Sequence, residues 1–275
     1  MSNRIKIILG YLLGFVCSLI VSLLTILVIL KFTIYNSSYV YNLVNKNDYY
    51  NKVSLDIREE MENYMVSSGF LESILDDIYT IDDVKKDINN YLDNLYLGQK
   101  TNVDKEKIES KLNDNIDKYL KESNLSVINE DDIKSFVSDI SSIYEKEVTL
   151  YHTFDSFLAS FARIDKLINI GIIVSVVLVI VLFVVILKGL KTVSIESSLI
   201  AASLILIFIR FVIVEKVDIE NILLITENFS DILQILLLNI RKLLLISGII
   251  LAVLGFAIIV STNYNKKMKV LKTSV

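Results

Sequence analysis

Four long runs of apolar residues flank one long polar segment, and this layout is the main pattern of the chain. Residues 7–30, 167–187 and 243–265 carry no charged side chain, and residues 197–214 carry only Arg210. A helix needs about 20 mostly apolar residues to cross the hydrocarbon core of a bilayer. The pattern therefore predicts an all-α integral membrane protein with four transmembrane helices and a helical extracytoplasmic domain between the first and the second.

The boundaries of these runs divide the chain into three predicted parts. Residues 1–31 would form a cytoplasmic N-terminus and the first span, and residues 32–165 an acidic helical extracytoplasmic domain. Residues 166–275 would form three further spans with a short basic cytoplasmic loop and tail. The first run is longer than the core of a signal peptide and lacks a small-residue cleavage site, so we expect an uncleaved anchor.

Within residues 32–165, apolar side chains recur every three or four positions, which is typical of one face of a helix. One such stretch contains Ile108, Leu112, Ile116 and Tyr119 or Leu120, and another runs from Ile133 to Phe161. We expect four or five helices that form a bundle or a hairpin-like, coiled-coil stalk, with no sheet. The second stretch meets the second apolar run without an intervening Gly or Pro. One continuous helix from about Asp131 to Leu187 would be roughly 85 Å long at 1.5 Å per residue.

The first span is predicted to continue outward in the same way, through the apolar positions of residues 39–64. Shorter helices would then pack between two long helices that are continuous with the first and second spans, which we call membrane-continuous posts. Helix ends are indicated by a capping box at Thr80 and Asp83 and by Asn129 as an N-cap before three acids. Gly98 and the pair at residues 68–69 are expected to end helices.

Short segments next to the apolar runs differ in charge. One set holds a single acid, Glu196, and its basic residues are Arg4, Lys6, Lys188, Lys191, Lys266, Lys267, Lys269 and Lys272. The other set is acidic: residues 32–165 hold 14 basic and 26 acidic side chains, a net charge of −12. Cytoplasmic loops carry an excess of Lys and Arg. We therefore predict a multi-pass plasma-membrane protein with both termini in the cytoplasm, although Lys31, Arg163 and Lys166 at the outer ends of spans oppose this rule.

Arg210 is the one charge inside an apolar run. An ionisable residue in a span is a candidate functional residue, but near the outer edge its long side chain can also reach the headgroups. We expect an intramembrane or interfacial ion pair between Arg210 and Glu215 or Asp218. Residues 218–238 have helical periodicity and would either lie on the membrane surface or extend the fourth span outward, which we favour.

Small residues spaced four apart allow helices to approach closely in membranes. The candidate packing residues are Gly10 and Gly14 in the first run and Gly248 and Ala252 in the fourth. They would pack helices within one chain or between copies in a homo-oligomer.

Chemistry is limited by composition. The chain has one Cys, Cys17, and one His, His152, so most pairings of a nucleophile with a base cannot be assembled. The acidic clusters lack the spacing and the glycine of a calcium loop, and we interpret them as caps and solvated faces. We expect no catalytic residues, no metal and no cofactor, and His152 is expected to have a structural or interfacial role.

Aromatic residues gather beside the first two runs: Tyr35, Tyr39, Tyr41, Tyr151, Phe154, Phe157 and Phe161. They suit an interfacial belt and a bundle core, or alternatively an exposed surface for a partner. Leu, Ile, Lys, Asn and Tyr dominate the composition, as in AT-rich genomes, so we expect a bacterial source.

The function that fits this layout is that of a non-enzymatic membrane protein. Its extracytoplasmic helical domain would contact a protein, an envelope component or a ligand, and its partners would be the lipid bilayer and a membrane or envelope protein rather than nucleic acid. The alternative is a subunit of an oligomeric channel or transporter.

Overall fold

The computed structural model describes residues 3–68, 71–123, 129–152, 155, 158–189, 195–216 and 227–273. Within these residues every regular element is a helix and no strand occurs, which confirms the all-α prediction. The chain divides into two compact units. Unit 1 comprises Met1–Asn36, Ile164–Ile219 and Ile235–Val275, and unit 2 comprises Ser37–Arg163 and Glu220–Gln234.

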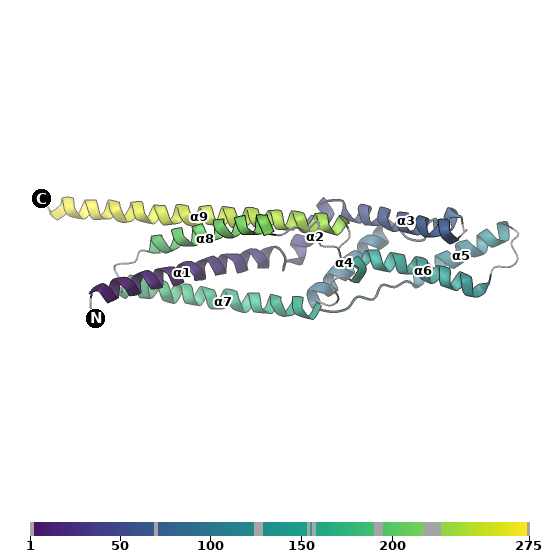
Figure 1. The fold of residues 1–275 in the computed structure, drawn as a ribbon, viewed down its shortest axis with the longest axis horizontal. Coiled ribbons are helices and arrows are strands. Elements are labelled where there is room, and N and C mark those ends of the chain that lie inside the picture. Colours follow the sequence, from purple (N-terminus) through teal and green to yellow (C-terminus); the bar gives the residue numbers. More distant parts are fainter. Residues whose placement is uncertain are drawn as a thin grey trace. The chain divides into compact units, whose positions relative to one another are not determined.

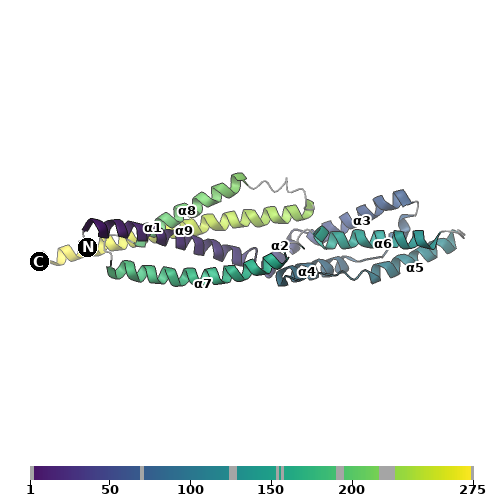
Figure 2. The same ribbon diagram turned by 60° about the horizontal axis from the view of Figure 1, so that its bottom comes forward.

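Unit 1 is built from the four apolar helices, and Figures 1 and 2 both show α1 and α7 side by side. The helices are α1 (Asn3–Phe32), α7 (Leu158–Gly189), α8 (Ile195–Lys216) and α9 (Glu227–Thr273), of which α7 and α9 also contribute residues to unit 2. The segments long and apolar enough to cross a membrane are Ile7–Phe32, Leu158–Ile186, Ile195–Val212 and Asn228–Tyr264. Four such helices, as predicted, are typical of a multi-pass membrane protein.

Helices α1 and α7 run in opposite directions. Lys31 Nζ lies 2.6 Å from Asp165 Oδ1, and a Cβ placed on Gly171 would lie 3.0 Å from Leu27 Cδ1. Residue numbers therefore increase along α7 in the direction in which they decrease along α1. Such antiparallel pairing is expected for consecutive spans.

The outward faces of unit 1 are apolar. Side chains such as Ile8, Phe208 and Val260 are more than 60% exposed. A soluble protein rarely exposes contiguous apolar surface of this extent, whereas hydrocarbon can cover it without cost. The exposure therefore agrees with helices whose outer surface contacts lipid.

Unit 2 is a bundle of short helices around one hydrophobic core (Figure 1). Its elements are α2 (Ser37–Lys46), α3 (Tyr49–Ser68), the 3-10 turn η1 (Glu72–Leu75), α4 (Ile81–Leu97), α5 (Glu106–Glu122), α6 (Glu130–Val148) and the 3-10 turn η2 (Leu150–His152). Among the described residues, five α-helices lie wholly within this unit, in agreement with the predicted four or five. Burial of one Ile or Leu side chain contributes about 1.5–3 kcal/mol. The predicted faces do point inward, since Leu112 and Ile140 are completely buried.

The prediction of membrane-continuous posts is wrong on both sides of unit 2. Helix α6 ends at Val148 and α7 begins at Leu158, and between them Leu150 and His152 both adopt φ of 52°, in the left-handed region. Leu150 is buried in the core of unit 2, so the chain turns to place it there instead of continuing the helix. Likewise α1 ends at Phe32, and a turn precedes α2.

Local signals for helix ends are confirmed where the structure describes them. The Thr80 and Asp83 side chains form the capping box of α4, and the Asn129 side chain accepts from the Asp131 backbone N–H. Gly98 ends α4 with a φ of 69°. At the predicted stop after α3, the helix ends at Ser68 and the next residue lies outside the described part.

Residues 218–238 were predicted either to lie on the membrane surface or to extend the fourth span, and the bounds of α9 test this in part. From Glu227 onward the helix runs without interruption into the fourth span, so the favoured interpretation is confirmed for residues 227–238. Residues 217–226 lie outside the described residues. Phe229 and Ile232, in the first turns of α9, are buried in the core of unit 2.

Candidate functional site

The predicted ion pair of Arg210 can be placed only in part. Arg210 lies in α8, and its guanidinium carbon stands 5.3 Å from the centre of the Phe211 ring. The side chain of Glu215 and the whole of Asp218 fall outside the described residues. The pairing therefore stays a prediction, and the aromatic contact is the interaction that the structure adds.

Two glycines of α9 lie against α8. A Cβ on Gly248 would be 3.1 Å from Ile207 Cγ1, and one on Gly255 would be 2.8 Å from Ile200 Cγ1. Ala252, which the sequence paired with Gly248, is only partly buried. Because the two glycines are seven residues apart, they fall on one face of α9 after two turns. The later glycine of α9 meets the earlier isoleucine of α8, so the two helices are antiparallel.

Helices α1 and α8 meet through small side chains. Gly10 and Gly14 of α1 are buried as well. Cys17 of α1 shares a hydrophobic cluster with Ala202 of α8. The small residues near them, each no more than 2% exposed, are Ser18 and Ser22 on α1 and Ser198 and Ser203 on α8. The Ser22 hydroxyl lies 3.3 Å from the Ala202 carbonyl. The sequence signal is a Ser-x-x-x-Ser and a Ser-x-x-x-Ala spacing, whereas each of the predicted packing pairs contains a glycine.

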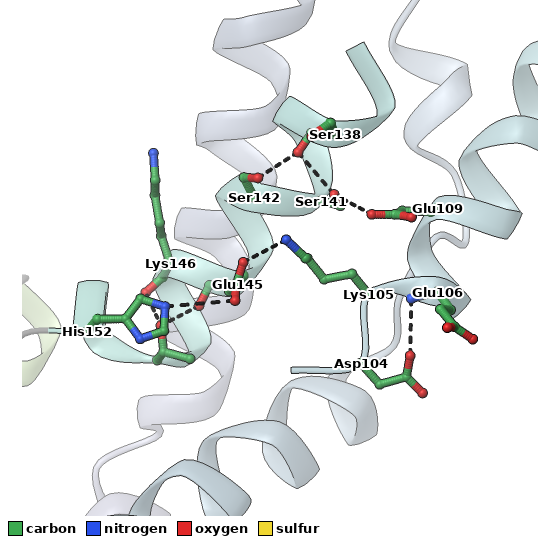
Figure 3. Close-up of polar contacts among 11 residues, drawn as sticks. Asp104, Lys105, Glu106, Glu109, Ser138, Ser141, Ser142, Glu145, Lys146 and His152 are labelled. Carbon is green, nitrogen blue, oxygen red and sulfur yellow. Dashed lines mark hydrogen bonds and ion pairs between the residues drawn. The ribbon is translucent and has the colours of Figure 1, made fainter. Parts of the chain in front are cut away.

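The lone histidine takes part in a polar network at the end of α6, shown in Figure 3. His152 Nδ1 lies 3.2 Å from Asp155 Oδ2, and its Nε2 lies 3.8 Å from Glu145 Oε1. Lys105 Nζ lies 2.8 Å from the other oxygen of Glu145. The network ties η2 to α6 and to the start of α5. Among the described residues, no group of three His, Cys, Asp or Glu is arranged to hold a metal ion.

Several acids serve as acceptors between helices of unit 2. The Tyr144 hydroxyl of α6 donates to Asp87 of α4 over 2.8 Å, and the Tyr64 hydroxyl of α3 donates to Asp139 of α6 over 2.5 Å. Burial raises the pKa of Asp87, although the hydrogen bond from Tyr144 lowers it in part. Burial and the nearby carboxylate raise the pKa of Tyr144, so its hydroxyl stays a donor. Asp87 and Asp139 therefore link neighbouring helices of unit 2.

Aromatic residues near the spans belong partly to this bundle. Tyr41 and Phe161 pack against the core of unit 2, and Phe161 meets the Tyr96 ring edge-on at 5.3 Å. Phe154 and Phe157 lie outside the described residues. Tyr41 and Phe161 therefore belong to the core of the bundle, which is one of the two predicted alternatives.

A hollow on unit 2, lined entirely by described residues, is a candidate binding site. It measures about 470 Å³ and lies between α3 and the segment that follows η1. Its walls are Ser54, Leu55, Arg58, Leu75, Asp76, Asp77 and Tyr79. We call it the α3–η1 hollow. It combines aliphatic, aromatic and charged side chains, as small recognition sites do.

Side-chain hydrogen bonds to backbone carbonyls fix the wall of the hollow that η1 and the residues after it form. Four consecutive backbone carbonyls, of residues 74–77, each accept a hydrogen bond from a side chain. The donors are Asn115 for Ile74 and Asp76 (2.9 Å each), Arg58 for Leu75 (3.3 Å) and Lys111 for Asp77. Further along the same segment, the Tyr79 hydroxyl donates across the hollow to the Ser54 carbonyl of α3 over 2.9 Å. A site whose backbone is fixed in advance loses less entropy on binding.

Charge is distributed unevenly in the α3–η1 hollow. Arg58 Nε donates to Glu62, and Arg58 Nη2 lies 3.7 Å from Asp76 Oδ1, so this cation is compensated within the protein. The Asp77 carboxylate, in contrast, has no ion-pair partner within the described part of the chain. Asp77 also adopts a φ of 56°, an uncommon conformation for a residue other than glycine.

The sequence contained one signal for this site. Val53, Ile57 and Met61 recur every four residues on α3 and are buried, whereas Leu55 falls off that face and is 69% exposed. An apolar residue on the polar face of an amphipathic helix has no role in the core. Asp76 and Asp77 gave no such signal, because an acidic pair without the spacing of a calcium loop is typical of helix caps and solvated faces.

No family model matches this sequence, and neither the curated proteins nor the solved structures include a chain with significant similarity to it.

Proposed function

We propose that this is a non-enzymatic multi-pass protein of the plasma membrane whose unit 2 lies outside the cytoplasm and binds a protein, an envelope component or another ligand there. The α3–η1 hollow carries the proposal. It presents the exposed Leu55 and the Asp77 carboxylate, which has no ion-pair partner among the described residues, on a backbone held by side-chain hydrogen bonds. Such pre-formed combinations of apolar and charged groups are features of recognition surfaces.

Charge supports the orientation. The short basic segments at the N-terminus, around residues 188–191 and in the tail favour the cytoplasmic side. Residues 32–165, with their net charge of −12, would then face outward. Antiparallel pairing of α1 with α7 and of α8 with α9 agrees with a chain that crosses back and forth.

The alternative of a conducting or transporting subunit gains little support from the contact between α1 and α8. The Ser18 hydroxyl donates to the Phe15 carbonyl over 2.7 Å, and the Ser22 hydroxyl donates to the Ser18 carbonyl over 2.8 Å. The Ser18 hydroxyl is thus used within its own helix, and the Ser22 hydroxyl also reaches the Ala202 carbonyl of α8 at 3.3 Å. Both patterns occur in ordinary packing of membrane helices.

Site-specific photo-cross-linking in intact cells tests the proposal with the full-length chain. A photoreactive phenylalanine analogue would replace Leu55 at the hollow. A matched control would replace Val66, which is 80% exposed on the same helix. Eleven residues separate the two sites, so Val66 lies on nearly the same face, about 16 Å further along α3.

We expect discrete adducts from Leu55 that are weak or missing from Val66. Identical adducts at both positions would indicate non-specific proximity and contradict a binding site. An absence of adducts at both positions, together with conductance of the purified protein in bilayers, would favour the channel alternative.

A further inference from the structure

We propose that the α3–η1 hollow is a lysine-recognition site, which takes the ammonium group and aliphatic stem of a lysine side chain from a protein partner. This inference rests on the proposed function and names the chemistry of the same site. It follows from the charge balance of the hollow, from its shape and from the fixed backbone beneath it.

Charge favours a cation. Two positive groups, Arg58 and Lys111, stand beside three carboxylates, of Glu62, Asp76 and Asp77. Arg58 already contacts Glu62, and Lys111 donates to the backbone carbonyl of Asp77 rather than to its carboxylate. The rim therefore keeps a net negative charge, and Asp77 is free to accept from an ammonium group. The acidic surface around it would attract a basic partner from a distance.

The walls favour an aliphatic stem. Leu55 and Leu75 supply apolar surface, and the Tyr79 ring supplies an aromatic one. A lysine side chain has four methylene groups that gain from such contact while its charged end reaches the carboxylates. An arginine would bring a planar guanidinium, which prefers a two-pronged carboxylate contact. The separate carboxylates of two successive residues suit the compact ammonium group better.

The shape favours a partner protein over a free small molecule. Two sequence segments, α3 and residues 75–79, supply all of the lining residues. Sites for small ligands usually enclose most of the ligand surface. A hollow with two walls would hold a free amine only weakly, whereas a side chain anchored by the rest of its protein needs only a local pocket.

Saturation-transfer NMR on the full-length protein in neutral detergent micelles tests the recognition chemistry. The probe is Nα-acetyl-lysine methylamide, and Nα-acetyl-norleucine methylamide keeps the aliphatic stem without the charge. We expect transfer to the lysine stem, and binding of the norleucine compound that is about three- to tenfold weaker, as expected for loss of an exposed charge contact.

Two double variants with equal net charge separate the site from general electrostatics. Asp76→Asn with Asp77→Asn changes the rim, while Asp131→Asn with Asp132→Asn removes two exposed acids from the first turn of α6. The first should weaken lysine binding about three- to tenfold and the second should leave it within twofold. Asp76→Glu with Asp77→Glu should restore binding, and this rescue controls for misfolding.

Equal loss in both Asn variants, or equal binding of the lysine and norleucine probes, would overturn the proposal. The same Asn variants in the photo-cross-linking experiment separate this failure from failure of the proposed function. If the Leu55 adduct persists unchanged in Asp76→Asn with Asp77→Asn, the binding role stands and lysine recognition is wrong. If that adduct alone disappears, lysine recognition is supported in the cell.

Discussion

At the scale of single residues, the tyrosine–aspartate hydrogen bonds of unit 2 show how an acidic bundle keeps its helices together. The bond between Tyr144 and Asp87 is partly buried, and the one between Tyr64 and Asp139 is exposed. A buried acceptor that loses its donor costs more than an exposed one, because water cannot replace the donor.

Tyr144→Phe should therefore destabilise the contact of α4 with α6 by about 1–3 kcal/mol. Tyr64→Phe, the matched control, should change stability by no more than about 0.5 kcal/mol. Hydrogen exchange of the α4 and α6 amides in the full-length protein measures both effects. Equal protection in the two variants would contradict the structural role given to Tyr144.

The pH dependence of Tyr144→Phe follows from the pKa of Asp87. This pKa is raised in the folded protein by burial. A carboxyl group with a raised folded pKa binds protons more readily when folded, so acidification through that pKa adds stability. A protonated Asp87 also no longer needs a donor. The deficit of Tyr144→Phe should be largest near neutral pH and shrink as the pH falls through the raised pKa of Asp87. A deficit that grows in acid would contradict this account.

At the scale of elements, α8 is the helix of unit 1 that contacts both α1 and α9. It meets α1 through small side chains at Ser22 and Ala202 and meets α9 through Gly248 and Gly255. Since hydrocarbon provides no hydrophobic drive between helices, close approach through small residues supplies the packing energy instead.

Gly255→Leu should separate α8 from α9, because a Cβ there already meets Ile200 Cγ1 at 2.8 Å and the Glu196 carbonyl oxygen at 3.0 Å. Overpacking of this kind typically costs about 1–3 kcal/mol, which corresponds to a melting temperature in detergent lower by roughly 2–10 °C. Ala252→Leu, at the partly buried neighbouring position, is the control and should have a smaller effect. A larger effect at Ala252 would restore the pairing that the sequence indicated.

At the scale of the whole molecule, the side of the membrane that unit 2 occupies decides which partners it can reach. Labelling of intact cells with an impermeant maleimide measures it. Cys17, which is completely buried, would be replaced by Ser, and single cysteines would be placed at the exposed Ser123 and in the basic tail at Ser274. We expect labelling at Ser123→Cys and none at Ser274→Cys. The reverse pattern would place unit 2 in the cytoplasm and direct the search to intracellular partners.

Features that depend on neighbouring residues along the chain were predictable without the structure. Hydropathy over 20 residues located the four apolar helices, and periodicity identified the buried faces of α5 and α6. The caps at Thr80 and Asn129 were equally readable, because a cap is a contact within four residues.

Two features required the tertiary structure: the helix ends that are caused by packing, and the contacts between residues far apart in the sequence. The break after α6 follows from burial of Leu150, and no Gly or Pro marks it. Phe229 joins the core of unit 2 from a position 71 residues beyond the last buried member on α7, Leu158. The α3–η1 hollow arises in the same way, since α5 supplies Asn115 and Lys111 to a wall some 40 residues earlier. Such contacts depend on the path of the whole chain, which local patterns do not encode.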